Sequence, residues 1–195
     1  MIRLAIFASG TGSNAQKIIQ YFEESDDVEI SLIVSNKANA GVLNFAEHYD
    51  IPSMIIDRQF FYHTKQIVFE LNHQSIDYII LAGFLWLIPS YLVKAFANKI
   101  INIHPALLPK YGGKGMYGLH VHDAVKKAGE NKSGITIHYV NESYDDGAII
   151  FQTSCEIYPE DLPTDIQKKV QILEHKYYPE IIEKIVLGEV KKRST

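Results

Sequence analysis

The chain has 195 residues, of which 47% are hydrophobic and 22% charged, a composition typical of globular proteins that excludes a disordered or low-complexity chain. Its formal charge of −4 provides no general attraction for nucleic acid or for an anionic membrane. The single cysteine, Cys155, excludes an intramolecular disulfide framework and a cysteine-based zinc site. The apolar runs at 4–8 and 78–88 are too short for a signal peptide and a membrane span, respectively. We therefore expect a cytoplasmic protein with no nucleic-acid or membrane partner, either a monomer or a homodimer.

Short apolar runs alternate with amphipathic segments over residues 1–104. We predict strands at 3–9, 30–35, 53–56, 77–82 and 99–103, separated by helices at 13–24, 40–49, 63–73 and 89–97. Ser13 and Gln16 have the spacing of a capping box at the start of the first helix. Continuous apolar strands separated by helices are typical of a parallel sheet that is covered on both faces.

The pattern changes after residue 104. Four glycines in 111–118 predict a mobile loop, followed by a helix at 119–128. Strands at 134–140 and 148–153 flank a polar turn at 145–147 and predict an antiparallel pair. A long helix is expected at 164–187, with Thr164 and Gln167 as a second capping box and Pro179 kinking or dividing it. The basic tail at 191–193 is expected to be solvated.

These elements predict an α/β fold: an open, mostly parallel, twisted and Rossmann-like sheet with helices on both faces. An antiparallel C-terminal hairpin and a long C-terminal helix complete it.

The turn after the first strand, at 9–15, matches the pattern GxGxxA and opens the first helix. Glycines let the backbone approach an anion, and the free N–H groups of a helix start point at it. The second strand lacks the terminal carboxylate that a dinucleotide site uses, so the turn suits one phosphomonoester better than a pyrophosphate. The alternative is a tight turn in which the glycines serve packing alone.

Asn102 and His104 lie two residues apart on a predicted strand, so both side chains point to the same face at its carboxyl end. An amide beside an imidazole can hold a developing oxyanion and move a proton. A carboxylate from Asp145 or Asp146 would raise the pKa of His104, although spacing alone does not bring that turn to it. The alternatives are a structural Asn–His pair and two turn-forming aspartates.

Other candidates carry weaker signals. His120 and His122 lack a third ligand at a diagnostic spacing, so solvated side chains are expected rather than a metal site. The segment 85–88 is typical of a protein core, although its backbone can also bind a planar heterocycle. Glu174 and His175 either reach a site or face solvent.

The order of several short motifs resembles that of the phosphoribosylglycinamide formyltransferases, a folate-dependent family of purine synthesis. The resemblance covers nearly the whole chain and rests on residues 8–14, 35–37, 81–84, 102–105, 107–111, Thr136 with His138, Asp145 with Gly147, and Gln171 with Glu174 and His175. Each motif is weak support by itself, whereas their order and spacing together are specific.

The resemblance implies transfer of the formyl group of 10-formyltetrahydrofolate to the amine of phosphoribosylglycinamide, without a metal. It implies one domain over 1–195, with a nucleotide-binding half at 1–100 and a catalytic and folate-binding half at 101–195. Asn102 and protonated His104 would stabilise the oxyanion, and Asp145 would keep His104 charged and help to move the proton. The implied ribonucleotide-binding residues are Gly12, Ser13, Asn14, Lys99, Gln171 and Glu174. The implied folate-binding residues are Leu85, Trp86, Leu87, Ile88 and Asn102. Thr136 and His138 are implied to support the site, the Thr136 hydroxyl by holding water.

The chain departs from the family pattern at several places. Trp86 stands in a segment where the family often has an arginine. Phe60 or Phe61 stands where an arginine for the folate tail is often found, and Arg58 is close but out of register. Asp146 replaces a second glycine after the implied catalytic aspartate, and the loop at 112–118 is longer than in many members.

Other activities use the same three catalytic residues. One alternative for this chain is formyl transfer to methionyl-tRNA or to a sugar nucleotide, in a group of proteins that usually carry an additional C-terminal domain. A second is hydrolysis of formyltetrahydrofolate, in proteins that usually carry an N-terminal regulatory domain. The alternative from another class is a non-catalytic nucleotide-binding module that has kept only the glycine-rich turn.

Overall fold

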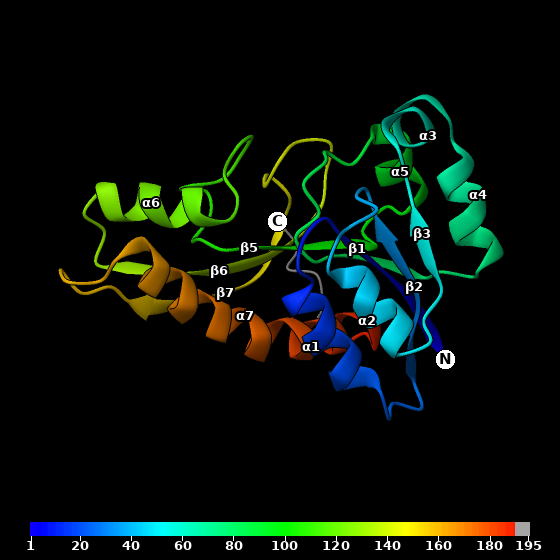
Figure 1. Cartoon of the computed structure of the whole chain (residues 1–195), viewed down its shortest axis with the longest axis horizontal. Coiled ribbons are helices and arrows are strands. Elements are labelled where there is room, and N and C mark those ends of the chain that lie inside the picture. Colours follow the sequence, from blue (N-terminus) through cyan, green and yellow to red (C-terminus); the bar gives the residue numbers. More distant parts are fainter. Residues whose placement is uncertain (190–195) are drawn as a thin grey trace.

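A single sheet organises the computed structural model, which describes residues 1–189 (Figure 1). Its strand order is β3-β2-β1-β4-β5-β6-β7, and β1 to β5 are parallel, whereas β6 and β7 each run antiparallel to the preceding strand. The strands are β1 (Ile2–Ala8), β2 (Val28–Ser35), β3 (Ser53–Ile55), β4 (Tyr78–Leu81), β5 (Ile100–His104), β6 (Lys132–Tyr139) and β7 (Ile149–Glu156). The predicted α/β sheet with an antiparallel hairpin is confirmed. The basic tail at 191–193 lies outside the described residues.

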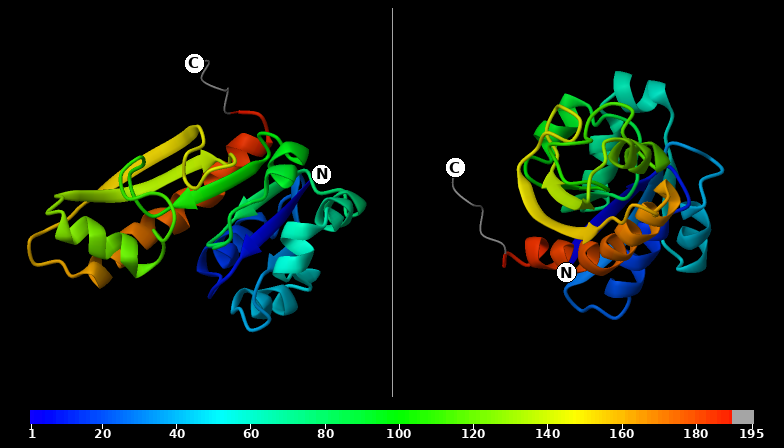
Figure 2. Two further views of the ribbon diagram at one scale, coloured as in Figure 1. Left: turned by 90° about the horizontal axis from the view of Figure 1, so that it is seen from above. Right: turned by 90° about the vertical axis from the view of Figure 1, so that its left-hand side faces the viewer.

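Helices cover both faces of this sheet (Figure 2). Helices α1, α2 and α7 pack on one face, and α3, α4 and α5 pack on the other. The helices are α1 (Ser13–Phe22), α2 (Val42–His48), α3 (Arg58–His63), α4 (Gln66–His73), α5 (Ser90–Ala95), α6 (Leu119–Lys127) and α7 (Pro163–Val186). No helix within residues 1–189 is long and apolar enough to cross a membrane.

Two predicted helices differ from the structure. The expected helix at 63–73 forms over 66–73 as α4, after extended Thr64. A separate helix that was not predicted, α3, precedes it and starts at an N-cap, Asp57, whose carboxylate accepts a hydrogen bond from the Phe60 N–H. Helix α7 continues through Pro179 as one element of 24 residues, so of the two expected effects of this proline, a kink or a division, the division does not occur. Pro179 is buried in the core, where tertiary packing offsets a local cost of about 3 kcal/mol.

Neither predicted capping box forms. The N-cap of α1 is Gly12, and Ser13 is already helical, with its hydroxyl accepting a hydrogen bond from the Gln171 amide. At α7 the carboxylate of Asp165 accepts from the N–H of Leu162, so Thr164 lies inside the first turn. The two predictions placed the N-cap one and two residues too late, respectively.

Alternation along β5 and β6 creates one polar face beside one apolar face. The isoleucines at 101, 103, 135 and 137 belong to the core that includes α7. Between them, Asn102 lies opposite His138 and His104 opposite Thr136, because successive strand residues point to opposite sides. Four polar side chains therefore share the face that is turned away from α7.

Candidate active site

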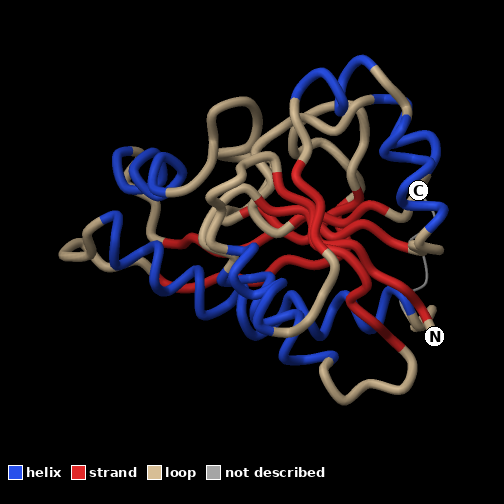
Figure 3. Tube along the Cα trace, turned by 45° about the vertical axis from the view of Figure 1, so that its right-hand side comes forward, coloured by secondary structure: helices blue, strands red, loops and turns tan. Residues whose placement is uncertain are grey.

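A cleft of about 580 Å³ opens at the carboxyl ends of β1, β4 and β5. From β1 to β3, successive strands are added on one side of β1, whereas β4 lies on the other side of β1. The strand order therefore reverses at this point. Crevices at such reversals bind ligands in open α/β sheets. Figure 3 shows loops gathered over the strand ends, and residues from both halves of the chain line the cleft.

Asn102, His104 and Asp145 converge in this cleft. Asp145 Oδ1 lies 3.4 Å from Asn102 Nδ2, and Asp145 Oδ2 lies 3.4 Å from His104 Nδ1. The backbone N–H of Gly113 donates to Asp145 Oδ2 over 2.9 Å, which fixes the carboxylate from the glycine-rich loop. The fold thus brings the aspartate turn, whose position spacing alone did not settle, to the end of β5.

His138 orients the Asn102 amide. Its Nδ1 lies 2.9 Å from the Tyr139 carbonyl oxygen, an obligatory acceptor, so Nδ1 carries the proton. Nε2 then accepts from Asn102 Nδ2 over 3.1 Å. The two N–H groups of this amide point at His138 and at Asp145, and the longer contact to Asp145 is the one more readily exchanged for a ligand oxygen.

His104 is buried between two acceptors in the ligand-free site, the Tyr111 carbonyl at Nε2 and the Asp145 carboxylate at Nδ1. The side chain is 4% exposed, and its Nε2 lies 2.8 Å from the Tyr111 carbonyl oxygen, which accepts the Nε2 proton. Burial lowers the pKa of His104, and the charge of Asp145 with the Tyr111 carbonyl offsets only part of that effect. The carboxylate therefore acts in the expected direction, but burial has the larger effect and leaves the pKa of His104 below its ordinary value.

Asp145 is ionised. Burial alone would raise the pKa of its carboxyl group, but the neighbouring imidazoles of His138 and His104 and the Gly113 N–H together hold this pKa below its usual range. The site accordingly pairs a carboxylate with a buried imidazole, two groups between which a proton can be exchanged.

The glycine-rich turn forms the wall beyond β1. Gly12 has a φ of 83°, and a Cβ there would lie 2.8 Å from the Val42 Cα, so this position requires glycine for the turn and for packing. The N–H of Gln16 is the first of α1 to bond back, to the Gly12 carbonyl. The preceding N–H groups of the helix start have no intrahelical partner and are available to an anion.

Asn14 and Glu174 join α1 to α7 at this wall, with 3.1 Å between Asn14 Nδ2 and Glu174 Oε2. Asn14 Oδ1 is buried without a partner. Burial raises the pKa of Glu174 to about 7, and the Asn14 hydrogen bond lowers it in part. The pair offers a ligand one free acceptor and one carboxyl group near its titration point.

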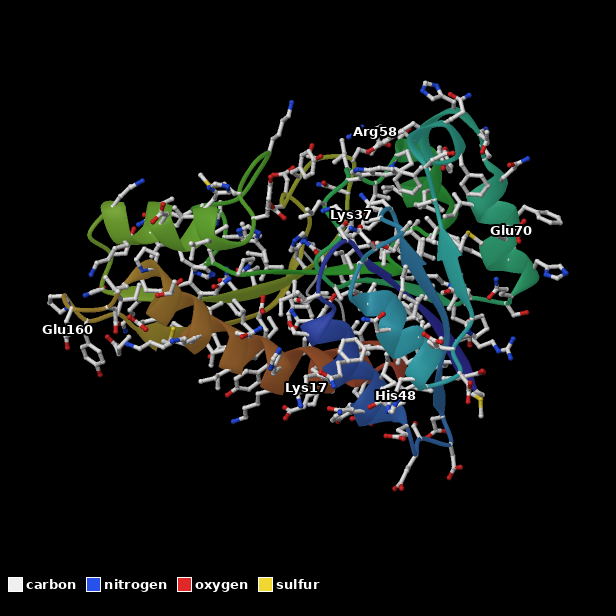
Figure 4. The ribbon with its side chains drawn as sticks, viewed as in Figure 1. Lys17, Lys37, His48, Arg58, Glu70 and Glu160 are labelled. Carbon is white, nitrogen blue, oxygen red and sulfur yellow. The ribbon has the colours of Figure 1, made fainter. Side chains whose placement is uncertain are left out.

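The segment 85–88 forms the opposite wall. The Leu85 N–H donates to the Ser9 hydroxyl over 2.9 Å, and the Tyr62 hydroxyl donates to the Leu87 carbonyl over 3.0 Å, so this backbone is held from both sides. Trp86 lines the cleft and lies beneath the Arg58 guanidinium, which is 4.9 Å from the ring centroid. Figure 4 shows Arg58 at the start of α3, on the far side of the molecule from Glu160.

Comparison with known proteins decides the family. The family described as formyl transferase matches residues 2–182. The chain belongs to the formyl transferase family. Its relatives include phosphoribosylglycinamide formyltransferases from Arabidopsis thaliana, a chloroplastic protein that is 40% identical over 98% of this chain and 68% of the relative, and from Bacillus subtilis, 36% identical over 95% of both.

Solved structures agree with this assignment. The phosphoribosylglycinamide formyltransferase of Anaplasma phagocytophilum has a TM-score of 0.89 at 32% identity, with 97% of this chain and 88% of that chain covered. The enzyme from Bacillus halodurans has a TM-score of 0.84 at 35% identity, with 94% and 95% covered. The resemblance noted from the motifs is confirmed, and the chain is an enzyme of the formyltransferase class.

Three residues implied by the resemblance lie elsewhere or have other partners in this formyltransferase. Lys99 precedes β5 at the end opposite to the cleft, with its ammonium 5.8 Å from the Tyr78 ring centroid. Gly12 is buried behind the turn, while its neighbours line the cleft. The Thr136 hydroxyl donates to the Ala106 carbonyl and accepts from Leu108 and Gln152, so protein groups occupy the positions expected to hold water.

The two histidines of α6 differ in their surroundings. His120 is exposed, as expected, whereas His122 is 2% exposed and lines the cleft, so the expectation that both are solvated is wrong. Burial, followed by the nearness of His104, lowers the pKa of His122 to about 4, and its Nδ1 is buried without a partner. Residues 1–189 contain no cluster of three or more side chains suited to a metal.

Backbone groups complete the formyltransferase site, and sequence reasoning missed them. Besides the Gly113 N–H, the Tyr111 carbonyl holds His104 from a residue with a φ of 58°. A Cβ at Gly112 would lie 3.2 Å from the Asp145 Cβ and closer still to Leu108, so glycine lets this loop approach the aspartate. The run of glycines was the available signal, since a backbone contact has no side-chain pattern.

Proposed function

We propose that this formyltransferase transfers the formyl group of 10-formyltetrahydrofolate to the amine of phosphoribosylglycinamide, a step of purine synthesis. The observation that carries the proposal is the convergence of an amide, an imidazole and a carboxylate between two different walls of one cleft. One wall is a helix start suited to a phosphomonoester, and the other is a backbone segment suited to a planar heterocycle.

The ribonucleotide is assigned to the wall formed by α1 and α7. Ser13 and Asn14 would meet the phosphate through the N–H groups of the helix start. Gln171, which donates to the Ser13 hydroxyl, and Glu174, which accepts from Asn14, would meet the rest of the ribonucleotide. The unpartnered Asn14 Oδ1 supports this assignment, because a buried acceptor without a donor is costly until a ligand supplies one.

The folate is assigned to the segment 85–88 and to Asn102. The ring would bind the fixed backbone of this segment, with the buried Ile88 side chain beneath it. We assign the carboxylate tail of the folate to Arg58, which lies over Trp86 at the edge of this wall. A guanidinium that stacks on an indole keeps its donors free for a carboxylate.

The chemistry begins with attack of the glycinamide amine on the formyl carbon, which forms a carbon–nitrogen bond and leaves a negative charge on the formyl oxygen. Asn102 would donate to this oxygen by releasing its long contact to Asp145. Neutral His104 would take the proton from the attacking nitrogen, and the resulting imidazolium would be stabilised by the adjacent Asp145 carboxylate.

Collapse of the intermediate then breaks the bond from the formyl carbon to N10 of the folate. The His104 imidazolium would return the proton to that nitrogen, directly or through water, which restores the neutral imidazole. The products are the N-formylated ribonucleotide and tetrahydrofolate. Loss of one preorganised oxyanion donor costs about 10²–10³ in rate, and placing the two substrates together contributes independently of it.

A matched pair of aspartate variants tests the proposal. Protein, ribonucleotide and a 10-formyl folate analogue are mixed, and the absorbance of the deformylated folate is followed. Asp145→Asn keeps the shape but removes the charge beside His104, and we expect kcat to fall by about 10²-fold or more. Asp146→Asn, at an exposed neighbour that accepts a bond from Asn141, is the control and should keep wild-type kcat.

Each other outcome contradicts the proposal in a distinct way. Turnover by the wild-type protein with folate and water alone indicates a hydrolase. No turnover under either condition indicates a binding module. Equal kcat for Asp145→Asn and the wild type would refute the assignment of the carboxylate while leaving the activity in place.

A further inference from the structure

Tyr178 connects α7 to the two strands beneath Asn102. Its side chain is fully buried, and its hydroxyl lies 2.9 Å from the Leu81 carbonyl oxygen and 3.1 Å from the Ile101 carbonyl oxygen. Burial, with the charge of Glu174, raises the pKa of Tyr178 well above its ordinary value, so the group stays protonated. Because both partners are carbonyls, the single O–H donates to both.

The two carbonyls flank the position of Asn102. The Ile101 carbonyl belongs to the peptide that leads directly into Asn102, and Leu81 is the residue of β4 that pairs with Asn102 across the ladder. Leu81 also ends β4, so the chain passes from it into the segment that forms the folate wall. One hydroxyl therefore holds two parallel strands at the level of the catalytic amide.

The same tyrosine sets the position of α7. Gln171, Glu174 and Tyr178 follow one another at spacings of three and four residues, so they lie along one face of the helix. Gln171 and Glu174 line the cleft, whereas Tyr178, further along the helix, does not. Figure 1 shows α7 running along the sheet, so sliding of this helix would move Glu174 relative to Asn102.

We infer that Tyr178 is a positioning residue, whose hydroxyl locks α7 to β4 and β5 and so keeps the ribonucleotide-binding and folate-binding walls in register. This inference rests on the proposed function. Tyr178 touches neither substrate. Its removal therefore leaves both substrates bound but misaligned, and misalignment by about 1 Å can cost about 10²-fold in rate.

The test compares two tyrosine-to-phenylalanine variants in the formyl-transfer assay. For Tyr178→Phe we expect kcat to fall by about tenfold or more, with the KM of each substrate within about threefold of wild type. The matched control is Tyr91→Phe, which removes a hydroxyl that donates to the Phe61 carbonyl over 2.6 Å on the other face of the sheet. It should lower the melting temperature without lowering kcat.

Two unnatural side chains at position 178 separate the hydrogen bond from packing. p-Fluorophenylalanine fills the space of the hydroxyl without a donor, so it replaces the phenylalanine variant if that variant does not fold, and it should show the same loss of kcat. p-Aminophenylalanine restores a donor at the same place and should recover most of the wild-type kcat. Circular dichroism and the melting temperature establish that each variant is folded.

The outcomes separate this inference from the proposed function. A folded Tyr178→Phe or p-fluorophenylalanine protein with kcat within about twofold of wild type overturns the inference and leaves formyl transfer intact. A loss of kcat that p-aminophenylalanine does not reverse also overturns it, because the loss then comes from packing. A wild-type protein without ribonucleotide-dependent turnover removes both claims.

Discussion

The free energy of unfolding should depend on pH through Glu174. Burial raises the pKa of this carboxyl group from 4.5 to about 7 in the folded protein. Between these values the folded chain holds a proton that the unfolded chain has released. The contribution of this proton to stability is therefore fully present below about pH 4.5 and is lost as the pH rises through about 7.

The size of the effect follows from the difference between the two pKa values. At 1.36 kcal/mol for each pH unit, the loss between about pH 4.5 and 8 is at most about 3 kcal/mol. Because Glu174 keeps part of its surface exposed, we expect about 2 kcal/mol. Glu174→Gln keeps an acceptor for Asn14 but has no proton to lose. This variant should match the wild type near pH 5 and melt about 4–8 °C higher near pH 8.

The assay is thermal unfolding of both proteins across this pH range, without substrates. Asn14→Ala is the second arm, because the Asn14 hydrogen bond lowers the pKa of Glu174 and its loss should move the transition to higher pH. A difference in melting temperature that is constant between pH 5 and 8 would refute the reasoning, since Glu174 would then hold the same charge throughout.

Three further substitutions test other parts of the structure. Gly12→Ala, at a φ of 83° and against Val42, should lower the free energy of unfolding by about 2–3 kcal/mol in urea titrations, and an unchanged midpoint would contradict this. In Gly147→Ala, the added Cβ would overlap the Tyr139 carbonyl and displace the turn that carries Asp145. We expect kcat to fall at least about tenfold, and a wild-type kcat would show that the turn tolerates a Cβ. Arg58→Met keeps an aliphatic stem over Trp86 but loses the positive charge. The KM for a folate with its glutamate tail should therefore rise about five- to tenfold at constant kcat, whereas an unchanged KM would place the tail elsewhere.

The strands were predictable because their apolar runs are continuous, and because the polar residues that interrupt these runs follow the two-residue period of a strand. Asn102 and His104 interrupt the isoleucines of β5 with a period of two, and the structure shows them on one face. The helix breaks were less predictable. The end of α3 depends on the extended backbone at Thr64, and the continuity of α7 through Pro179 depends on core packing, which no local pattern contains.

The assembly of the site shows where local patterns stop being informative. Asp145 reaches His104 only because β6 and β7 are antiparallel and return their connecting turn to the end of β5. Conversely, Lys99 is close to Asn102 in sequence but lies at the opposite end of the same strand. The role that the resemblance implied for Lys99 therefore does not fit its position at the far end of β5, whereas sheet topology brings the distant aspartate to the cleft.

The protonation of His104 was the least predictable feature, because it depends on two opposed effects that only a three-dimensional site can weigh. A nearby carboxylate favours the imidazolium, and motif reasoning counts that partner alone. In the folded protein the imidazole is also enclosed by the glycine-rich loop and the end of β5, and burial outweighs the carboxylate. In the proposed mechanism, this balance would change when the attacking amine becomes positively charged, since a proton transferred from it would then be held between Tyr111 and Asp145. In the mechanism we propose, burial would make His104 a base before the attack and Asp145 would make it an acid afterwards, which is the sequence of roles that formyl transfer requires.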